Sequence, residues 1–336
     1  MGMRWYVARR LAWALVATWL AVTLTFGVLL AAPNPGADAA AAQCASQDRD
    51  PEQCRQQYLE SRGLDRPAHV QYIDYMTDLA ALDFGYSESQ EEPVTAAIAD
   101  AWIYSAQYFV PSIIISVLIG YSIGLYSALN RYTLTDYLGS FVAYFGISIP
   151  NFWFAIVLIL VVGVYFREAS LLGVSLDALS LRTYYETSYG VFTVENAKQL
   201  IMPVIVLATA SVASQMRYSR AQALEYANAD FVKTARAKGA STWRVLVAHV
   251  LRVALVPLST ILIVDILAVL FAGSFIIEAI FQIPGLGRLQ LEAITQKDTD
   301  LVAAVTLIPV FLAIVGNLIQ DLAYVLLDPR IDYGDR

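Results

Sequence analysis

Five basic side chains gather in residues 231–257, a short segment that lies between two long apolar stretches. The five are Lys233, Arg236, Lys238, Arg244 and Arg252. After Gly239, apolar residues recur at the spacing of an amphipathic helix. They are Trp243, Leu246, Val247, Val250 and Leu251. Such a helix must place its apolar stripe on a lipid surface or a docked protein, so the segment predicts binding rather than catalysis.

Catalysis by the chain itself is not expected. A phosphate-binding loop needs a Gly-Lys pair, because the lysine neutralises the phosphates, and this sequence has no Gly-Lys dipeptide. Only two histidines occur, His69 and His249, and there is no His-Glu-x-x-His motif. Two cysteines without a nearby histidine make a poor metal site. We therefore expect no cofactor or metal in this chain, and any ATP hydrolysis belongs to another polypeptide.

The apolar stretches contain a few polar residues that deserve functional attention, because a charge at mid-bilayer is costly. Asp265 lies near the middle of one stretch, where it either lines a translocation pathway or pairs with another helix. Asp321 shares a helical face with Asn317, which favours a hydrogen bond between helices, and neither aspartate has an obvious Lys or Arg partner within the spans.

A proline interrupts a third stretch. Pro150 breaks the apolar residues 137–166, since the residue before a proline leaves helical geometry. We interpret this stretch as one crossing with a break at residues 148–151. The candidates for the translocation pathway are Asp265, Ser148, Pro150 and Asn151.

Composition identifies the class of protein that must position these residues. The chain is 58% hydrophobic and 15% charged, which is typical of an integral membrane protein. A crossing needs about 20 apolar residues, and six stretches are long enough. They are Leu11–Ala32, Tyr104–Leu129, Tyr137–Phe166, Leu200–Met216, Leu255–Ile277 and Val302–Leu327. We predict an all-α integral membrane protein with six transmembrane helices.

Basic residues predict the orientation. Of the 22 Lys and Arg residues, 13 fall in the N-terminus, residues 130–136, residues 217–254 and the C-terminal tail. Positive charge marks the cytoplasm, so we expect a multi-pass protein of the cell membrane with both termini inside. Arg9 and Arg10 before an apolar run also fit a cleaved signal peptide, but the run is longer than such peptides carry, and we favour an uncleaved first span.

Both cysteines, Cys44 and Cys54, lie in the outer segment that follows the first span. An outer compartment permits a disulfide between them. The alternative is two free thiols.

Several motifs resemble one known family. The basic segment contains TARAKG, which is similar to the cytoplasmic coupling loop of ABC-importer permeases of the peptide type. Four further segments resemble the same family in the expected order. They are GLDRPAHVQYIDYM with LDFGYS (residues 63–87), GISIPNFWFA (146–155), GSFIIEAIFQIPGLGRLQLEAI (273–294) and NLIQDLAYVLLDPRIDYGD (317–335). The resemblance is to the dipeptide, oligopeptide and nickel permeases of the first-permease, DppB-like branch.

The resemblance implies a MetI-like permease core at residues 101–336, preceded by an extra span and an outer segment at residues 1–100. Residues 217–254 would form the cytoplasmic coupling loop. On the family pattern its contact residues are Lys233, Thr234, Ala235, Arg236, Lys238, Gly239 and Trp243. Ala235→Glu should then charge the contact surface.

The same resemblance implies the partners. They are a second homologous permease, two cytoplasmic ATPase subunits that bind ATP and Mg, an external substrate-binding protein and the lipid bilayer, with no nucleic acid. Three alternatives remain open at this stage. They are a stand-alone secondary transporter or channel, a membrane scaffold without transport, and an ABC importer of oligosaccharides or nickel complexes rather than peptides.

Overall fold

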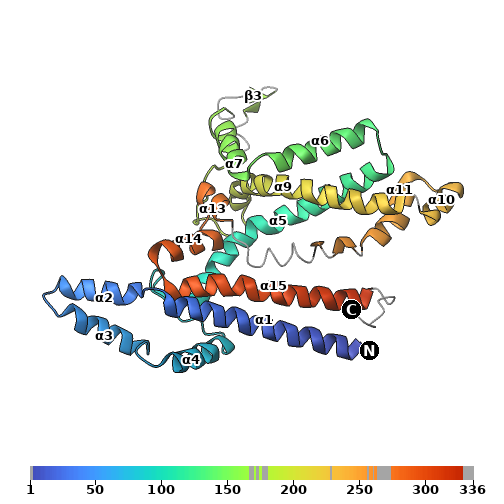
Figure 1. Ribbon diagram of the computed structural model, residues 1–336. Coiled ribbons are helices and arrows are strands. Elements are labelled where there is room, and N and C mark those ends of the chain that lie inside the picture. The colour runs from blue at the N-terminus through green and yellow to red at the C-terminus, as the bar shows by residue number, and fades with distance from the viewer. Residues whose placement is uncertain are drawn as a thin grey trace. The chain divides into compact units, whose positions relative to one another are not determined.

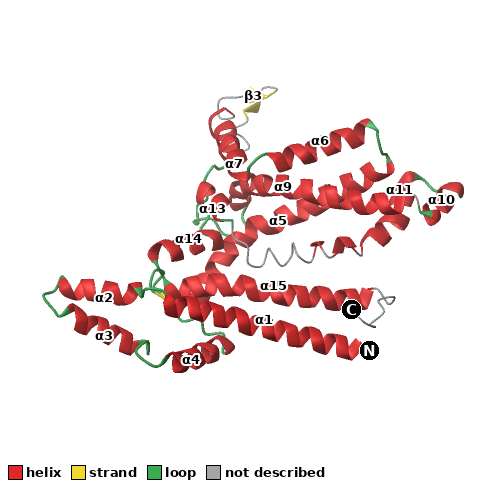
Figure 2. Ribbon diagram, viewed as in Figure 1, coloured by secondary structure: helices red, strands yellow, loops and turns green. Residues whose placement is uncertain are grey.

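A computed structural model describes residues 3–165, 170–171, 174–175, 181–227, 229–255, 257–259, 261–262 and 274–327. Helices make up most of these residues, as Figure 2 shows. The chain divides into two compact units, one of Met1–Trp102 with Leu286–Arg336 and one of Ile103–Gly285. Helix α5 (Val94–Leu129) contributes residues to both units.

The first unit combines the two ends of the chain. Its elements are α1 (Met3–Ala31), α2 (Pro35–Ala45), α3 (Pro51–Ser61), α4 (Ala68–Ala80), the antiparallel pair β1 (Tyr86–Ser87) and β2 (Glu92–Pro93), α14 (Leu286–Gln296) and α15 (Thr299–Leu327). The long helices α1 and α15 lie side by side and run in opposite directions (Figure 1). The first turn of α1 and the last turn of α15 therefore lie at the same end of this helix pair.

Local sequence explains why the short helices of the first unit begin where they do. Helices α2 and α3 each have proline in the first turn, where its missing N–H costs nothing. The Asn34 side chain accepts a hydrogen bond from the Ala37 amide at 3.0 Å, and Asp50 accepts one from the Glu52 amide at 3.0 Å. A disulfide between Cys44 and Cys54 joins the two helices.

The core of the first unit forms where the start of α5 packs with α14 and α15. Its buried side chains are small or aliphatic, which allows the helices to approach closely. They include Val94, Ile98, Leu289, Ala293, Leu301 and Ala304. This core holds the N-terminal end of α15 in place.

The second unit is built around two long helices. Its elements are the rest of α5, α6 (Leu134–Ser148), α7 (Asn151–Leu160), the π-helix η1 (Val161–Tyr165), β3 (Ser170–Leu171) paired with β4 (Val174–Ser175), α9 (Val194–Ala227), α10 (Asp230–Ala237), α11 (Thr242–Arg244), the π-helix η3 (Val245–Leu251) and α13 (Phe275–Phe281). Helices α10 and α11 lie at one end of α9 (Figure 1).

Helices α5 and α9 approach each other closely through small residues. A side chain at Gly120 would lie 2.6 Å from Cβ of Gln215, and one at Gly124 would collide with Ser219. Small residues four positions apart are the usual means by which membrane helices pack tightly. The Ser219 hydroxyl donates a hydrogen bond to the Gly120 carbonyl at 3.2 Å, which links the two helices at this point.

Residues 120–124 also read Gly-x-Ser-x-Gly, the pattern of a hydrolase nucleophile elbow. The elbow requires a sharp turn between a strand and a helix, whereas these residues lie in the middle of helix α5. Ser122 is exposed on the side away from the buried glycines. The motif therefore serves helix packing.

Four helical segments in the described part of the chain are long and apolar enough to cross a membrane. They are Trp5–Ala45, Val94–Leu129, Val194–Ala227 and Thr299–Asp321. The pair Leu134–Ser148 and Asn151–Gly163 adds a fifth if it forms one bent span. The break expected at residues 148–151 is present, with an angle of 97° between the two helices. The expected span at 255–277 lies largely outside the described residues, so the predicted count of six is not reached among them.

Candidate functional site

Helix α10 presents a basic face to solvent because its apolar face is buried. Val232 and Ala235, three positions apart, pack into a core with residues of α5, α9 and η3. Lys233, Thr234 and Arg236 are exposed. Within the described part of the chain, Lys233 forms an ion pair with Asp230 at 2.9 Å; both side chains are well exposed, so the pair contributes little to stability.

One predicted contact residue is therefore placed differently from the expectation. Ala235 is 7% exposed and belongs to the core of the second unit. Ala235→Glu would disrupt packing within the chain, so it does not charge the outer surface as the sequence suggested. The remaining members of the predicted contact set are exposed, namely Lys233, Thr234, Arg236, Lys238, Gly239 and Trp243.

The turn after α10 depends on Gly239. Its φ of +79° lies in the left-handed region, where a side chain is disfavoured by about 1–2 kcal/mol. Nothing lies within 4 Å of the position a Cβ would take, so backbone conformation alone demands glycine here. The amide of Gly239 donates to the Arg236 carbonyl at 2.9 Å and ends the helix. The chain then reverses into α11, where the Ser241 hydroxyl accepts from the Arg244 amide.

The amphipathic stripe predicted after Gly239 is only partly correct. Val245, Leu246 and Val250 are buried, but Trp243 is 71% exposed and Val247 is 42% exposed. The reason is that residues 245–251 form a π-helix, whose wider turn shifts which side chains share a face. The buried face packs on the chain's own helices. An exposed tryptophan therefore follows the Gly239 turn, in α11, the next helix after α10.

Sequence reasoning missed the ion pair that ties α9 to α6. Arg220 lies 3.0 Å from the Asp136 carboxylate through Nε and 3.1 Å through Nη2. Ser127 of α5 donates to the same carboxylate, and the Tyr132 amide donates at 2.9 Å. The Asp136 side chain is 4% exposed. The positions are 84 apart in the sequence, and no local pattern links them.

The residues predicted to line a translocation pathway are only partly described. Asp265 lies outside the described residues. Ser148 donates to the Tyr144 carbonyl at 2.7 Å and ends α6, and Pro150 precedes α7. Ser148 and Pro150 are exposed, whereas Asn151 is partly buried. These three residues form the break, and no described contact assigns them to a pathway.

A second carboxylate of the apolar stretches has a partner that the sequence did not suggest. Asp321 of α15 lies 2.9 Å from Arg10 of α1, rather than lacking a basic partner. Arg10 comes just before the apolar stretch of α1, so a search confined to the spans overlooks it. The pair fastens the N-terminal part of α1 to the C-terminal part of α15.

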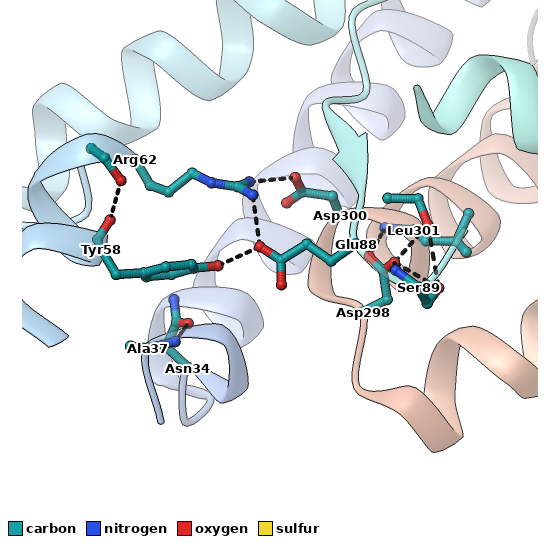
Figure 3. Close-up of polar contacts among 11 residues, drawn as sticks. Asn34, Ala37, Tyr58, Arg62, Glu88, Ser89, Asp298, Asp300 and Leu301 are labelled. Carbon is teal, nitrogen blue, oxygen red and sulfur yellow. Dashed lines mark hydrogen bonds and ion pairs between the residues drawn. The ribbon is translucent and has the colours of Figure 1, made fainter. Parts of the chain in front are cut away.

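A polar cluster fixes the other end of the first unit, as Figure 3 shows. Arg62, which directly follows α3, lies 2.7 Å from Glu88 and 3.4 Å from Asp300 of α15. Beside it, the Asp298 carboxylate accepts hydrogen bonds from the Ser87 hydroxyl at 2.6 Å and from the Ser89 amide at 2.9 Å. Burial opposes ionisation of Asp298, but these hydrogen bonds outweigh it and lower the pKa of its carboxyl group.

Residues 120–333 match the family model described as the binding-protein-dependent transport system inner membrane component. This range covers α9, α10, the Gly239 turn and η3. The chain belongs to this family.

Curated relatives agree over most of the chain. The oligopeptide transport system permease protein AppB of Bacillus subtilis is 34% identical over 280 residues, 83% of this chain and 85% of the relative. The dipeptide transport system permease protein DppB of the same organism is 32% identical over 329 residues, 97% of each chain. The di/tripeptide permease protein DppB of Pseudomonas aeruginosa is 32% identical over 337 residues, 97% of this chain and 98% of the relative.

These matches establish the class of protein. The chain is a multi-pass permease subunit of an ABC transport system with a MetI-like domain, and it is not itself an enzyme. A permease of this family works with ATPase and binding-protein partners. The expectations of a channel, a secondary transporter or a scaffold are thereby set aside.

Proposed function

We propose that this chain forms half of the translocation pathway of an ATP-driven importer for peptides. The single observation that carries the mechanism is the exposed basic face of α10, which is packed on a buried core and is followed in the next helix by the exposed Trp243. The substrate class rests on the relatives, whose names specify dipeptides, di/tripeptides and oligopeptides. We favour peptides over nickel complexes or oligosaccharides for this reason.

The coupling surface consists of Lys233, Thr234, Arg236, Lys238, Gly239 and Trp243. Lysine and arginine side chains attract an acidic partner surface, and an exposed tryptophan is a frequent anchor of protein interfaces. The partner on this surface is an ATPase subunit, which supplies ATP and Mg. Residues 217–254, both termini and residues 130–136 then lie on the cytoplasmic side.

Motion of the coupling surface passes to the spans through two contacts. Val232 and Ala235 lie in the same core as Val250 of η3 and Leu125 of α5. The Arg220–Asp136 pair joins α9 to α6 in addition. Because both contacts are buried, movement of α10 shifts the long helices as packed units rather than bending the loop alone.

The full importer consists of this chain, a second homologous permease, two ATPase subunits and an external binding protein. Residues 1–100 supply an extra span and an outer segment, and residues 101–336 supply the permease core. Asp265, Ser148, Pro150 and Asn151 are the proposed pathway residues. Closure of the ATPase pair shifts the permeases between outward-open and inward-open states.

Charge reversal at the coupling surface tests this proposal. The Lys233→Glu, Arg236→Glu variant keeps the buried face of α10 and should assemble in the membrane, but it should lose most ATP-driven peptide uptake in proteoliposomes. Arg131→Glu is the matched control, because Arg131 is exposed and lies outside α10. Normal uptake by the double variant, or equal loss in the control, would refute the coupling assignment.

A further inference from the structure

The first unit contains a cavity of about 330 Å³, and none of its lining residues belongs to the coupling surface or to the proposed pathway residues. Its apolar wall comes from the last turns of α1 and the first turns of α15. The side chains of this wall are Phe26, Leu29, Leu30, Ala303, Ala304 and Leu307. The volume lies at the lower end of the range of about 300–1,000 Å³ for small-molecule pockets.

The polar side of the cavity is acidic. Its charged residues are Asp74, Asp78, Asp83, Asp300 and Arg62. Arg62 is already occupied by Glu88 and Asp300, as Figure 3 shows. The four aspartates outnumber the two arginines that pair with acidic groups here, Arg62 and Arg66, so the potential is negative, which repels anions and attracts cations.

Asp78 is the acidic group best placed to meet a ligand. Arg66 pairs with Asp74 at 3.1 Å, and the Asp83 side chain accepts from the Gly85 amide at 3.0 Å. Among the residues that the structure describes, no side chain pairs with the Asp78 carboxylate. Its exposed position lets an incoming cation reach it.

A buried hydroxyl group in the cavity lacks a partner. The Tyr75 hydroxyl oxygen is buried, and within the described ranges no group forms a hydrogen bond with it. Burial, together with the nearby charge of Asp300, raises the pKa of Tyr75 to about 12, so the group stays a neutral donor. A buried donor without an acceptor costs free energy, which a ligand oxygen in the cavity would recover.

Helix α4, which carries Tyr75 and Asp78, is fastened to α1. The Tyr72 hydroxyl lies 2.7 Å from the Thr23 hydroxyl. The ring of Phe26 lies 5.3 Å from that of Tyr72 and 5.6 Å from that of Tyr75, between ring centroids. The polar and apolar walls of the cavity are therefore held at a fixed separation.

We propose that this cavity binds a small amphipathic cation. Its ammonium group meets Asp78, a carbonyl oxygen accepts from Tyr75, and an apolar group lies on the wall formed by α1 and α15. This chemistry is that of the amino end of a peptide whose first residue is apolar, or of the amide of an apolar amino acid. The acidic side excludes free carboxylates and phosphates of similar size.

Leucinamide is a suitable probe, because it carries all three groups, and N-acetyl-leucinamide is its match without the ammonium charge. Binding is measured by calorimetric titration of the permease–ATPase complex in lipid nanodiscs without the external binding protein. Leucinamide should bind saturably, and the acetylated form should bind at least roughly tenfold more weakly. Equal affinity for the two compounds, or no saturable binding, would overturn the proposal.

Variants locate the binding to this cavity. Asp78→Asn should weaken leucinamide binding roughly tenfold, and Tyr75→Phe should weaken it severalfold while keeping the ring contacts. Asp65→Asn is the matched control, since Asp65 lies in the same outer segment but does not line the cavity. Wild-type affinity in Asp78→Asn would contradict the site. The Lys233→Glu, Arg236→Glu variant should bind leucinamide normally. Leucinamide binding therefore tests the cavity, and ATP-driven uptake tests the coupling surface, independently of each other.

Discussion

The coupling region around α10 and the outer segment of the first unit are both held in place, but by different kinds of contact. The region around α10 is basic on its exposed face and is anchored by buried apolar side chains such as Val232 and Val250. The outer segment of the first unit is acidic and is held by a disulfide and by ion pairs such as Arg62–Glu88. An apolar anchor keeps Lys233 and Arg236 exposed for a partner, whereas Arg62 and Arg66 of the outer segment are engaged in ion pairs within the segment.

The difference indicates what each region does. A surface that must transmit force needs a dense core behind it, because packed side chains do not yield independently. A segment that does not transmit force can be held by a few separate contacts. We therefore expect substitutions behind α10 to impair coupling, and substitutions that remove the fastening contacts of the outer segment to affect its local stability rather than coupling.

The largest effect should follow from loss of the Arg220–Asp136 pair. Arg220→Ala leaves a buried, unpaired Asp136, which should destabilise the complex by about 3–5 kcal/mol. The measurement is thermal unfolding of the purified complex together with its yield. Arg217→Ala, an exposed neighbour on α9, is the control and should change little. Equal stability of the two variants would show that α9 is not held through this pair.

Removal of the disulfide should have an intermediate and local effect. The Cys44→Ser, Cys54→Ser variant frees α2 from α3 and should destabilise the outer segment by about 2–3 kcal/mol. Faster proteolysis of residues 35–61 would report this loss, and ATP-driven uptake should stay normal. If ATP-driven uptake by this variant fell as well, the outer segment would contribute to coupling, and the proposed difference between the two regions would be wrong.

In the coupling region, Gly239→Ala should have a smaller effect. Alanine at a φ of +79° costs about 1–2 kcal/mol and should shift the turn that presents Trp243. Uptake should fall severalfold while assembly remains normal. Gly27→Ala is the control, because no atom lies within 4 Å of its Cβ position and it lies inside helix α1. Identical uptake by both variants would mean that the turn does not matter.

The smallest effect should be a pH dependence in the outer segment. The folded state lowers the pKa of Asp298 below its ordinary value of 3.8, so its hydrogen bonds stabilise the fold above that pH. This stability should be lost as the pH falls through the folded pKa, by about 1 kcal/mol. Asp298→Asn should remove that part of the acid sensitivity in a thermal unfolding series. An unchanged series would show that Asp298 is not a stabilising contact.

Much of the fold follows from the sequence because the signals are local. Apolar length places the spans, Pro150 places the break between α6 and α7, and the basic segment places α10. The orientation of individual side chains does not follow, since it depends on helix type. A stripe drawn with α-helical spacing put Trp243 and Leu246 together, whereas the π-helix η3 separates them. We predicted Ala235 as a contact residue because the family pattern gives the place of a residue in the sequence. It does not give the direction in which the side chain points.

Long-range pairs are the other part that the sequence could not show. Arg220–Asp136 and Arg10–Asp321 join residues far apart in the chain, and each partner alone looks like an ordinary charge near a span end. The cavity beside Tyr75 likewise needs α1, α4 and α15 together. Such features arise from packing, which a single sequence does not specify.

Site-specific photo-crosslinking in the assembled transporter tests the central claim most directly. A photoreactive amino acid replaces Trp243, which is 71% exposed in α11. In a second sample it replaces Phe192, which is fully exposed in the loop before α9. The account predicts a crosslink to an ATPase subunit from position 243 and none from position 192. A crosslink to the ATPase from position 192, or its absence from position 243, would contradict the assignment of the coupling surface.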